Sequence, residues 1–164
     1  FYNKKGYFLA RKWITMSYFS WFVSHAHKHT VLINKLMTLG YTKEAMIDYF
    51  VFENMVEKEP SFCLLYANKQ KCHSVSYLNC YLCACPYFRF NDDGLTIEKN
   101  SVIKSQCSIA SKKSAWFMYE NVVHLDCSRC SLPHTKAFIR KHFDRDWSEI
   151  MKECFTSPKA DERQ

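Results

Sequence analysis

The feature of this sequence that most constrains its fold is the concentration of cysteine between residues 63 and 134, where eight of the nine cysteines lie. Two CxxC pairs, Cys80 with Cys83 and Cys127 with Cys130, occur in this stretch. Two intervening residues allow a tight turn to direct both sulfurs at one point, which is how thiolates chelate zinc or iron. Two such pairs, each with further cysteine or histidine nearby, predict a core built around bound metal.

The candidate ligands exceed what one tetrahedral ion can hold. They are Cys63, Cys72, His73, Cys80, Cys83, Cys85, Cys107, Cys127, Cys130 and His134. Two closed four-ligand sites would leave two of them over, so the sequence predicts two zinc ions, or one [4Fe-4S] cluster with one zinc. Cys85 followed by Pro86 is the feature that favours the cluster. The Cys-x2-Cys-x-Cys-Pro spacing differs from the bacterial ferredoxin run, and zinc is therefore preferred.

A disulfide framework is the main alternative for these cysteines, and free buried thiols are another. Nine cysteines leave one unpaired. CxxC loops are too short for most unstrained structural disulfides, and a chain of this length can bury a core without them. His124 is an alternative ligand or a hydrogen-bond donor to one. Cys154 falls on an apolar helical stripe, which predicts a packed thiol rather than a ligand.

Several of these strings resemble the cysteine-rich small domain family, a presumed metal-binding module. The resemblance lies in Cys72-His73, in NCYLCACPYF from Asn79 to Phe88, in the lone Cys107 and in DCSRCSLPH from Asp126 to His134. It covers roughly residues 63 to 143, and it departs in a long insertion at residues 91 to 106 and a wide gap between Cys63 and Cys72. It implies metal binding and brings no established catalytic activity with it.

Composition sets broad limits on the class of protein. The chain has 164 residues, 16% of them aromatic, with only three glycines and four prolines, which excludes long disordered or repetitive segments. The formal charge of +7 would fall to about +3 if eight thiolates held two zinc ions. Such a modest basic surface suits nucleic acid, an anionic membrane face or an acidic protein partner equally. Thiols used as ligands favour a reducing compartment, and the cytoplasm is the simplest prediction.

The first 60 residues are predicted to be helical. Residues 1–23 combine four basic residues with nine aromatics, and a helix from residue 8 would pack on the metal core. An amphipathic anchor on a membrane surface, with the protein then peripheral to the membrane, is the alternative. His25, His27 and His29 are predicted to lie in a solvated segment between helices, with a ligand role disfavoured. A helix over residues 30–39 should end at Gly40, and another should run from a Thr42 cap to residue 56.

The fold class is accordingly predicted as α+β, mostly helical, with a loop-rich metal-binding core. A helical N-terminal region at 1–60 precedes a cysteine-rich domain at 61–143, a C-terminal helix at 144–156 and a polar tail at 157–164. Residues 87–90 and 115–125 are predicted to pair as a short β-hairpin in the core. No apolar run approaches the roughly 18 residues that a membrane-spanning helix needs.

These patterns favour a metal-binding structural or interaction module, acting as a subunit or accessory protein of a larger complex. An iron–sulfur electron-transfer or redox protein is the first alternative, and a nucleic-acid-binding zinc module is the second. A metalloenzyme is disfavoured, because it needs an open coordination position with an acid or base beside it, and no HExxH or HxE…PCxxC motif occurs.

Overall fold

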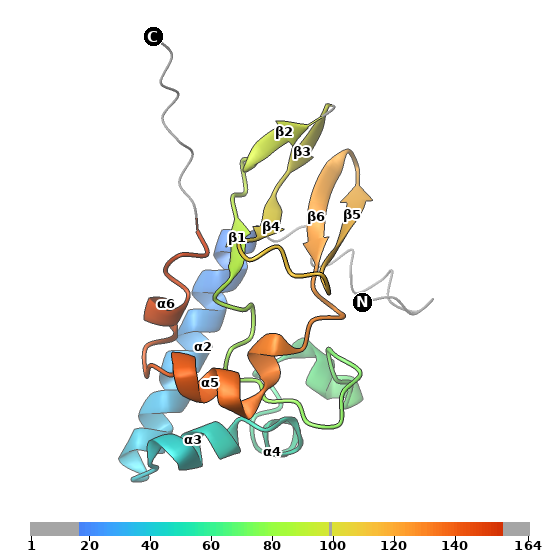
Figure 1. Ribbon diagram of the computed structural model, residues 1–164. Helices are drawn as coiled ribbons and strands as arrows, with labels where there is room; N and C mark the ends of the chain where they lie inside the picture. The colour runs from blue at the N-terminus through green and yellow to red at the C-terminus, as the bar shows by residue number, and fades with distance from the viewer. Residues whose placement is uncertain (1–16, 99, 156–164) are drawn as a thin grey trace.

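The computed structural model describes residues 17–98 and 100–155 of the chain. Helices gather at one end of the molecule and strands at the other, and the long helix α2 (Tyr18–Thr38) runs from the helical end to the strands (Figure 1). The remaining helices are α3 (Lys43–Tyr49), α4 (Phe52–Lys58), α5 (Lys136–His142) and α6 (Trp147–Ile150), with two short 3-10 helices, η1 (Leu64–Asn68) and η2 (Leu132–His134).

The strands form two small sheets in the part of the chain that the structure describes. Antiparallel β1 (Phe88–Phe90) and β4 (Ser105–Cys107) make the first. The second has the order β2-β3-β6-β5, and its strands are β2 (Thr96–Glu98), β3 (Ser101–Ile103), β5 (Ala115–Tyr119) and β6 (Val122–Asp126). β3 and β6 run parallel, and the other neighbours run antiparallel.

The prediction of a mostly helical fold is wrong, because six strands account for much of the described chain between residues 88 and 126. Each strand has only three to five residues, too few for a clear alternation of apolar and polar side chains. The prediction that 87–90 pairs with 115–125 is also wrong. β1 pairs with β4, and the 115–125 segment is itself a hairpin of β5 and β6.

The turn of that hairpin is formed by Glu120 and Asn121, whose φ angles are 47° and 64°. Two consecutive positive φ angles are typical of the type I′ turn, whose twist matches the flanking strands. Asn-Gly and Asp-Gly are the usual sequences for this turn, and Glu-Asn lacks that signal. The sequence therefore looked like one continuous strand.

Helix α2 is continuous through the histidine segment, so the predicted break at residues 25–29 is wrong. His25 and His29 lie on one helical face and are buried, whereas His27 is exposed. Asp92 caps the start of the helix, since its carboxylate accepts hydrogen bonds from the N–H groups of Tyr18 (2.7 Å) and Phe19 (2.9 Å). The contact ties the helix to the turn that follows β1.

The predicted helix end at Gly40 and the predicted helix start at Thr42 are confirmed. α2 ends before Gly40, whose φ of 77° is the left-handed conformation that favours glycine after a helix. The Thr42 side chain accepts a hydrogen bond from the N–H of Ala45 at 3.3 Å and caps α3. The single predicted helix to residue 56 is divided into α3 and α4 around Val51, which forms a β-bridge with Asn79.

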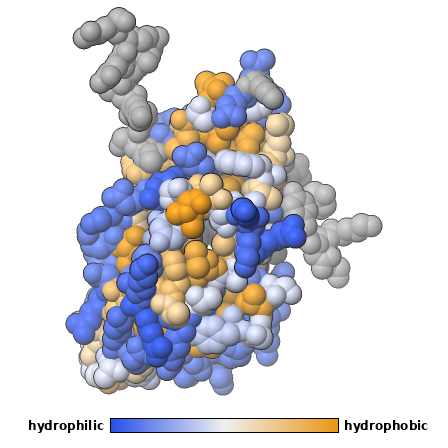
Figure 2. Space-filling view, viewed as in Figure 1, coloured by the Kyte–Doolittle hydropathy of each residue, from blue (hydrophilic) through white to orange (hydrophobic). Residues whose placement is uncertain are grey.

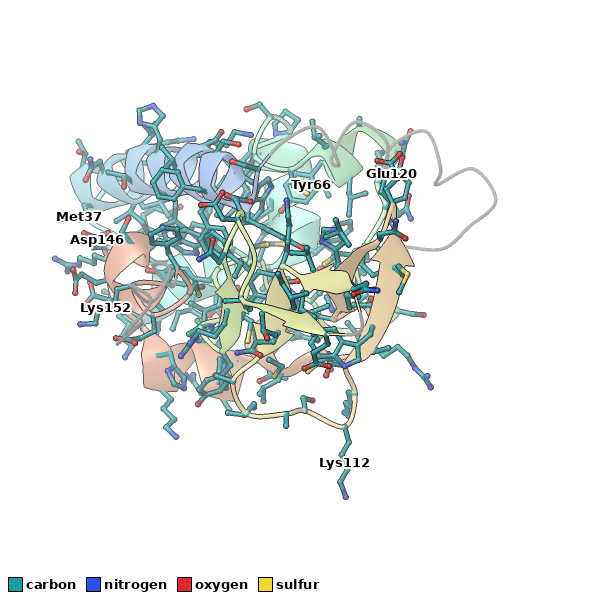
Figure 3. The ribbon with its side chains drawn as sticks, turned by 90° about the horizontal axis from the view of Figure 1, so that it is seen from above. Met37, Tyr66, Lys112, Glu120, Asp146 and Lys152 are labelled. Carbon is teal, nitrogen blue, oxygen red and sulfur yellow. The ribbon has the colours of Figure 1, made fainter. Side chains whose placement is uncertain are left out.

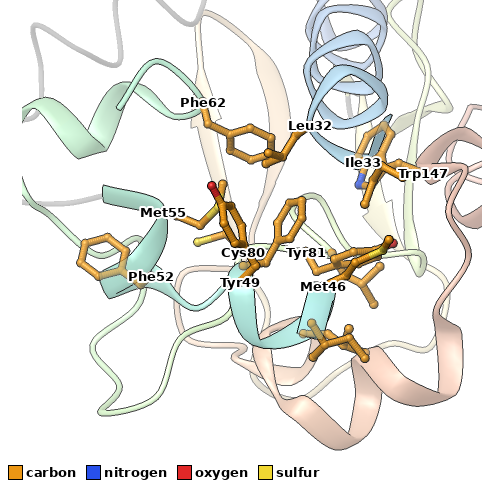
Figure 4. Close-up of a cluster of buried hydrophobic side chains, with 14 of the residues drawn as sticks. Leu32, Ile33, Met46, Tyr49, Phe52, Met55, Phe62, Cys80, Tyr81 and Trp147 are labelled. Atoms are coloured by element: carbon orange, nitrogen blue, oxygen red, sulfur yellow. The ribbon is translucent and has the colours of Figure 1, made fainter. Parts of the chain in front are cut away.

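The hydrophobic core lies between α2, α3, α4 and the segment that carries the first CxxC pair (Figure 4). Tyr81 and Leu82, inside that pair, are fully buried. The N–H of Cys80 donates to the Phe50 carbonyl at 2.8 Å, and the Tyr81 hydroxyl donates to the Asp144 carbonyl at 2.7 Å. The cysteine-rich segment is thus threaded through the helical core.

The C-terminal helix is shorter than the predicted 144–156 segment, since α6 covers only Trp147–Ile150. The apolar stripe predicted there is nevertheless buried, with Trp147, Met151 and Cys154 in the core. No helix among the described residues is both long enough and apolar enough to cross a membrane. The predicted surface anchor falls largely on residues 1–16, outside the described part.

Candidate metal centre

The tightest group of candidate ligands consists of Cys72, His73 and His134. Their ligand atoms all lie within 4.8 Å of one another, and no other three such atoms in the described chain do. The Cys72 sulfur is 3.1 Å from Nδ1 of His73 and 4.0 Å from Nε2 of His134. The two imidazole rings are 4.5 Å apart, centre to centre.

The hydrogen bonds of the two rings fix which nitrogens are free to bind an ion. Nε2 of His73 lies 3.0 Å from the Cys127 carbonyl oxygen, and Nδ1 of His134 lies 2.8 Å from the Asn79 carbonyl oxygen. A carbonyl only accepts, so those nitrogens must donate, and the opposite nitrogen of each ring carries a lone pair. Both lone pairs are on the side of Cys72. Metal-ligating histidines commonly donate their second nitrogen to a carbonyl in this way.

Burial keeps both histidines neutral, the form that coordinates metal. His134 is only 4% exposed, and burial lowers its pKa to about 4. Burial also lowers the pKa of His73. His73 lines a shallow hollow of about 480 Å³ together with Lys71 and residues 74–76. The group is therefore buried on the His134 side and open to solvent beside His73.

Four thiols form what we term the first sulfur group: Cys63, Cys72, Cys80 and Cys83. Burial, followed by the negative charge of the neighbouring Cys63, raises the pKa of Cys72 to about 11. Burial raises the pKa of Cys80 to about 12, and Cys72 and Cys63 add to the rise. Burial raises the pKa of Cys83 well above its ordinary value, and the charges of Cys80, Cys72 and Cys63 add to the rise. These four thiols thus lie near enough to repel one another when ionised.

The other four thiols form the second sulfur group: Cys85, Cys107, Cys127 and Cys130. Burial, then the charges of Cys85, Cys107 and Cys130, raise the pKa of Cys127 to about 12. Burial raises the pKa of Cys85 to about 11, with Cys130 and Cys107 contributing.

Contacts outside the sulfurs place the members of this second group together. Cys107 pairs with Phe88 in the β1–β4 ladder. Phe88 is three residues after Cys85, so the ladder brings Cys107 to the same part of the chain as Cys85. The hydroxyl of Ser111, in the loop after Cys107, lies 3.7 Å from the Cys130 sulfur. The Cys130 N–H donates to the Cys127 carbonyl at 2.9 Å, closing the CxxC turn.

A left-handed turn at Ala84 and Cys85 separates the two sulfur groups. Their φ angles are 82° and 64°, a conformation that residues other than glycine seldom adopt. The turn is closed by a 3.2 Å hydrogen bond from the Cys85 N–H to the Leu82 carbonyl. Such backbone strain costs roughly 1–3 kcal/mol per residue and persists only where the surrounding structure demands it. Here it places Cys83 in one group and Cys85 in the other.

Main-chain N–H groups close to the sulfur lower the pKa of several thiols, Cys63 and Cys85 among them. The N–H groups of Leu65 and Tyr66 lower the pKa of Cys63, and those of Tyr87 and Phe88 lower the pKa of Cys85. In both cases burial is the larger effect and raises the pKa. The donors lie two and three residues after the sulfur, so a local turn supplies them. N–H donors directed at sulfur stabilise a thiolate more than a thiol.

The sulfurs of each group lie farther apart than in a metal site. Zinc–sulfur bonds of about 2.3 Å in a tetrahedron put sulfurs about 3.8 Å apart. No three of these sulfurs lie within 4.8 Å of one another in the described chain. An ion would therefore have to draw the sulfurs of either group closer together.

The structure thus places all ten predicted ligands in or beside the two sulfur groups. All nine cysteines are free, so the disulfide alternative finds no support. His124 lies elsewhere: its Nδ1 is 2.7 Å from the Tyr18 hydroxyl and its ring stacks on Phe117. Cys154 is fully buried, and its thiol donates to the Cys85 carbonyl at 3.5 Å.

Sequence reasoning missed the residues that support the ligands. The Tyr66 side chain lowers the pKa of the Cys80 thiol, and the Ser111 hydroxyl lies 3.7 Å from the Cys130 sulfur. The carbonyls of Asn79 and Cys127 orient the two histidines. A carbonyl that orients a histidine has no signature in the sequence, because every residue carries one.

Comparison with known proteins adds no relative. No family model matches the chain, no curated protein sequence matches it, and no solved structure matches it. The resemblance to the cysteine-rich small domain family remains a prediction from the sequence strings.

Proposed function

We propose that this protein is a metal-binding structural module that holds two zinc ions and serves as an interaction subunit for a protein partner. The observation that carries the proposal is the division of eight cysteines into two groups of four. Each group contains one CxxC pair and two cysteines from elsewhere in the chain, the composition of a closed zinc site.

The electrostatics of the groups support a cation in each. Burial and mutual repulsion both oppose ionisation of the four thiols of a group together, as the raised pKa values of Cys72, Cys80 and Cys127 indicate. A divalent cation removes that penalty and displaces the protons. The N–H donors at Cys63 and Cys85 favour the thiolate that results.

The first site has more donors than one tetrahedral ion needs. The first sulfur group supplies four sulfurs, and His73 and His134 add two nitrogens whose lone pairs are on the side of Cys72. We place Cys72 among the ligands of this ion because it belongs both to the first sulfur group and to the tight group with His73 and His134. The second site would be formed by the second sulfur group alone.

A structural role fits these residues better than catalysis. The tight group of Cys72, His73 and His134 includes no carboxylate that could act as a base. On the open side, Lys71 is paired with the Glu53 carboxylate at 2.9 Å. When bound, zinc would supply folding free energy by cross-linking loops that have little regular structure.

The test is elemental analysis and an absorption spectrum of protein purified without oxygen. We expect two zinc ions per chain and no absorption in the visible range. A brown protein that absorbs near 400 nm would replace zinc by an iron–sulfur cluster in at least one site, the alternative that Cys85-Pro86 favours. Protein that folds without metal and binds none when zinc is added would overturn the proposal.

A further inference from the structure

Strand β5 (Ala115–Tyr119) lies at one edge of the four-stranded sheet (Figure 1). It pairs with β6 on one side, and no described strand lies on the other. Natural proteins protect such edges with charges, proline or bulges, because an exposed strand edge can pair with another chain. The five residues of β5, AWFMY, include no charge and no proline.

Two large apolar side chains of this strand are exposed. Trp116 is 54% and Met118 61% exposed, and they share one face of the sheet because they are two residues apart. Across the ladder they face Leu125 and Val123 of β6. Apolar surface is visible at the strand-bearing end of the molecule (Figure 2). An apolar edge without protective charges is a surface that a partner would cover.

Charges of opposite sign flank the strand. Lys112 and Lys113 precede it and Glu120 follows it, and all three side chains are exposed. Lys112 and Glu120 lie beyond the two opposite ends of β5, and in the view from above the strands of the sheet lie between them (Figure 3). None of the three forms an ion pair with another described residue.

We propose that two copies of this chain associate through antiparallel pairing of their β5 edges. Antiparallel pairing brings the Glu120 end of each copy beside the lysine end of the other, whereas parallel pairing would bring like charges together. A register centred on Phe117 sets Trp116 of one copy opposite Met118 of the other, on the same face. The charge pattern is thus complementary to itself, which is what a two-fold interface requires.

The interface would be small, so the dimer should be weak. Five paired residues a side, with two apolar anchors, lie at the low end of specific interfaces, and we expect association in roughly the micromolar range. The ion pairs at the two ends should make the dimer weaker at high salt. The inference does not depend on the proposed metal sites, because no residue of β5 belongs to either sulfur group.

Sedimentation equilibrium of the full chain, from about 1 to 200 μM, tests the proposal. Met118→Lys should abolish dimerisation without disturbing the fold, since the side chain is exposed. Ile97→Lys is the matched control: Ile97 is 74% exposed on β2, the opposite edge of the same sheet, and its substitution should leave the dimer intact. Circular dichroism establishes that both variants fold.

Charge exchange provides the second arm. We expect the dimer to be weakened at least about tenfold by Glu120→Lys alone, and by the double variant Lys112→Glu, Lys113→Glu. The triple variant that combines all three substitutions should recover most of the lost affinity, since each ion pair is re-formed with its charges exchanged. Wild-type protein that stays monomeric throughout the range overturns the proposal. So does a dimer that survives Met118→Lys, or one that the triple variant fails to restore.

Discussion

Acid should destabilise this protein through His25 and His29, and the size of the effect follows from their burial. His25 stacks on Trp21 at 4.8 Å and meets Trp147 at 4.9 Å. Burial, with smaller contributions from His29 and Lys28, lowers the pKa of His25 to about 3.

His29 is fully buried, and its ring lies 4.7 Å from that of Tyr81 and 5.1 Å from that of Phe50. Burial lowers the pKa of His29 to about 3, and the backbone of Tyr81 opposes this only in part. Both rings are therefore neutral in the folded protein over the ordinary pH range.

The direction of the effect follows from the two states of the chain. In the unfolded chain each histidine titrates near 6.5, so below that pH the unfolded state binds protons that the folded state does not. The contribution to stability is complete above pH 6.5 and is lost as the pH falls toward 3. At pH 5 the loss is about 2 kcal/mol for each histidine and about 4 kcal/mol for the pair. That is a large part of the 5–15 kcal/mol typical of a domain.

Urea unfolding at pH 7.5 and pH 5.0 measures this loss. With a slope near 2 kcal/mol per molar, we expect the midpoint of the wild-type protein to fall by about 2 M from these two residues, with any release of metal adding to the fall. His25→Phe and His29→Phe should each remove about half of the histidine contribution. His27→Gln, on the exposed side of the same helix, should remove none.

Comparing the variants with one another separates the histidines from the metal sites, because metal release affects all of them alike. If the double variant His25→Phe, His29→Phe loses as much stability on acidification as the wild type does, the reasoning from burial is refuted. A His27→Gln protein whose loss of stability on acidification is reduced as much as in the phenylalanine variants would refute it as well, because His27 is exposed and has no buried ring to protonate.

Three further predictions concern the candidate metal centre. Ala84→Gly should raise the free energy of unfolding by about 1 kcal/mol, seen as a higher melting temperature, because glycine tolerates the φ of 82° there. Ala26→Gly within α2 should lower the free energy of unfolding by a similar amount. Cys130→Ser should lose one zinc ion per chain in elemental analysis, whereas Cys154→Ala should keep both. His134→Gln should weaken zinc binding about 10–100-fold in competition with a chelator if its nitrogen is a ligand or supports one; unchanged affinity would exclude His134 from the site.

Features set by local chemistry were predictable from the sequence. The Thr42 cap and the Gly40 stop depend on residues within one turn of the helix end, and both were correct. The break at residues 25–29 was wrong for a physical reason. Histidine is polar in isolation, yet on α2 the rings of His25 and His29 enter an aromatic core that residues distant in sequence provide. Tertiary burial overrode the local preference.

The strands show the same limit more strongly. β3 and β6 are parallel neighbours about 20 residues apart in sequence, and nothing within either segment specifies that pairing. The CxxC pairs were predicted as ligands from their spacing, and Cys63 and Cys107 were added as the remaining cysteines of the stretch. The division of the cysteines into two groups was not predicted, because spacing indicates which close pairs chelate and leaves open which distant cysteines join them. The left-handed turn at Ala84 and Cys85 separates Cys83 from Cys85, and a segment without glycine gave no reason to expect that turn.

The same turn explains why the metal centre and the helical core should behave as one unit. The segment from Asn79 to Cys85 contributes to three regions at once: Tyr81 and Leu82 fill the helical core, Cys80 and Cys83 belong to the first sulfur group, and Cys85 begins the second. In its backbone, the Cys80 N–H donates a hydrogen bond to the Phe50 carbonyl at 2.8 Å, and the Asn79 N–H donates one to the His134 carbonyl at 3.2 Å. An ion that draws the sulfurs together therefore acts on a segment that the helices already hold. If the two proposed ions are bound, removing either should loosen the turn that the two groups share, and with it the packing of Tyr81 against α2.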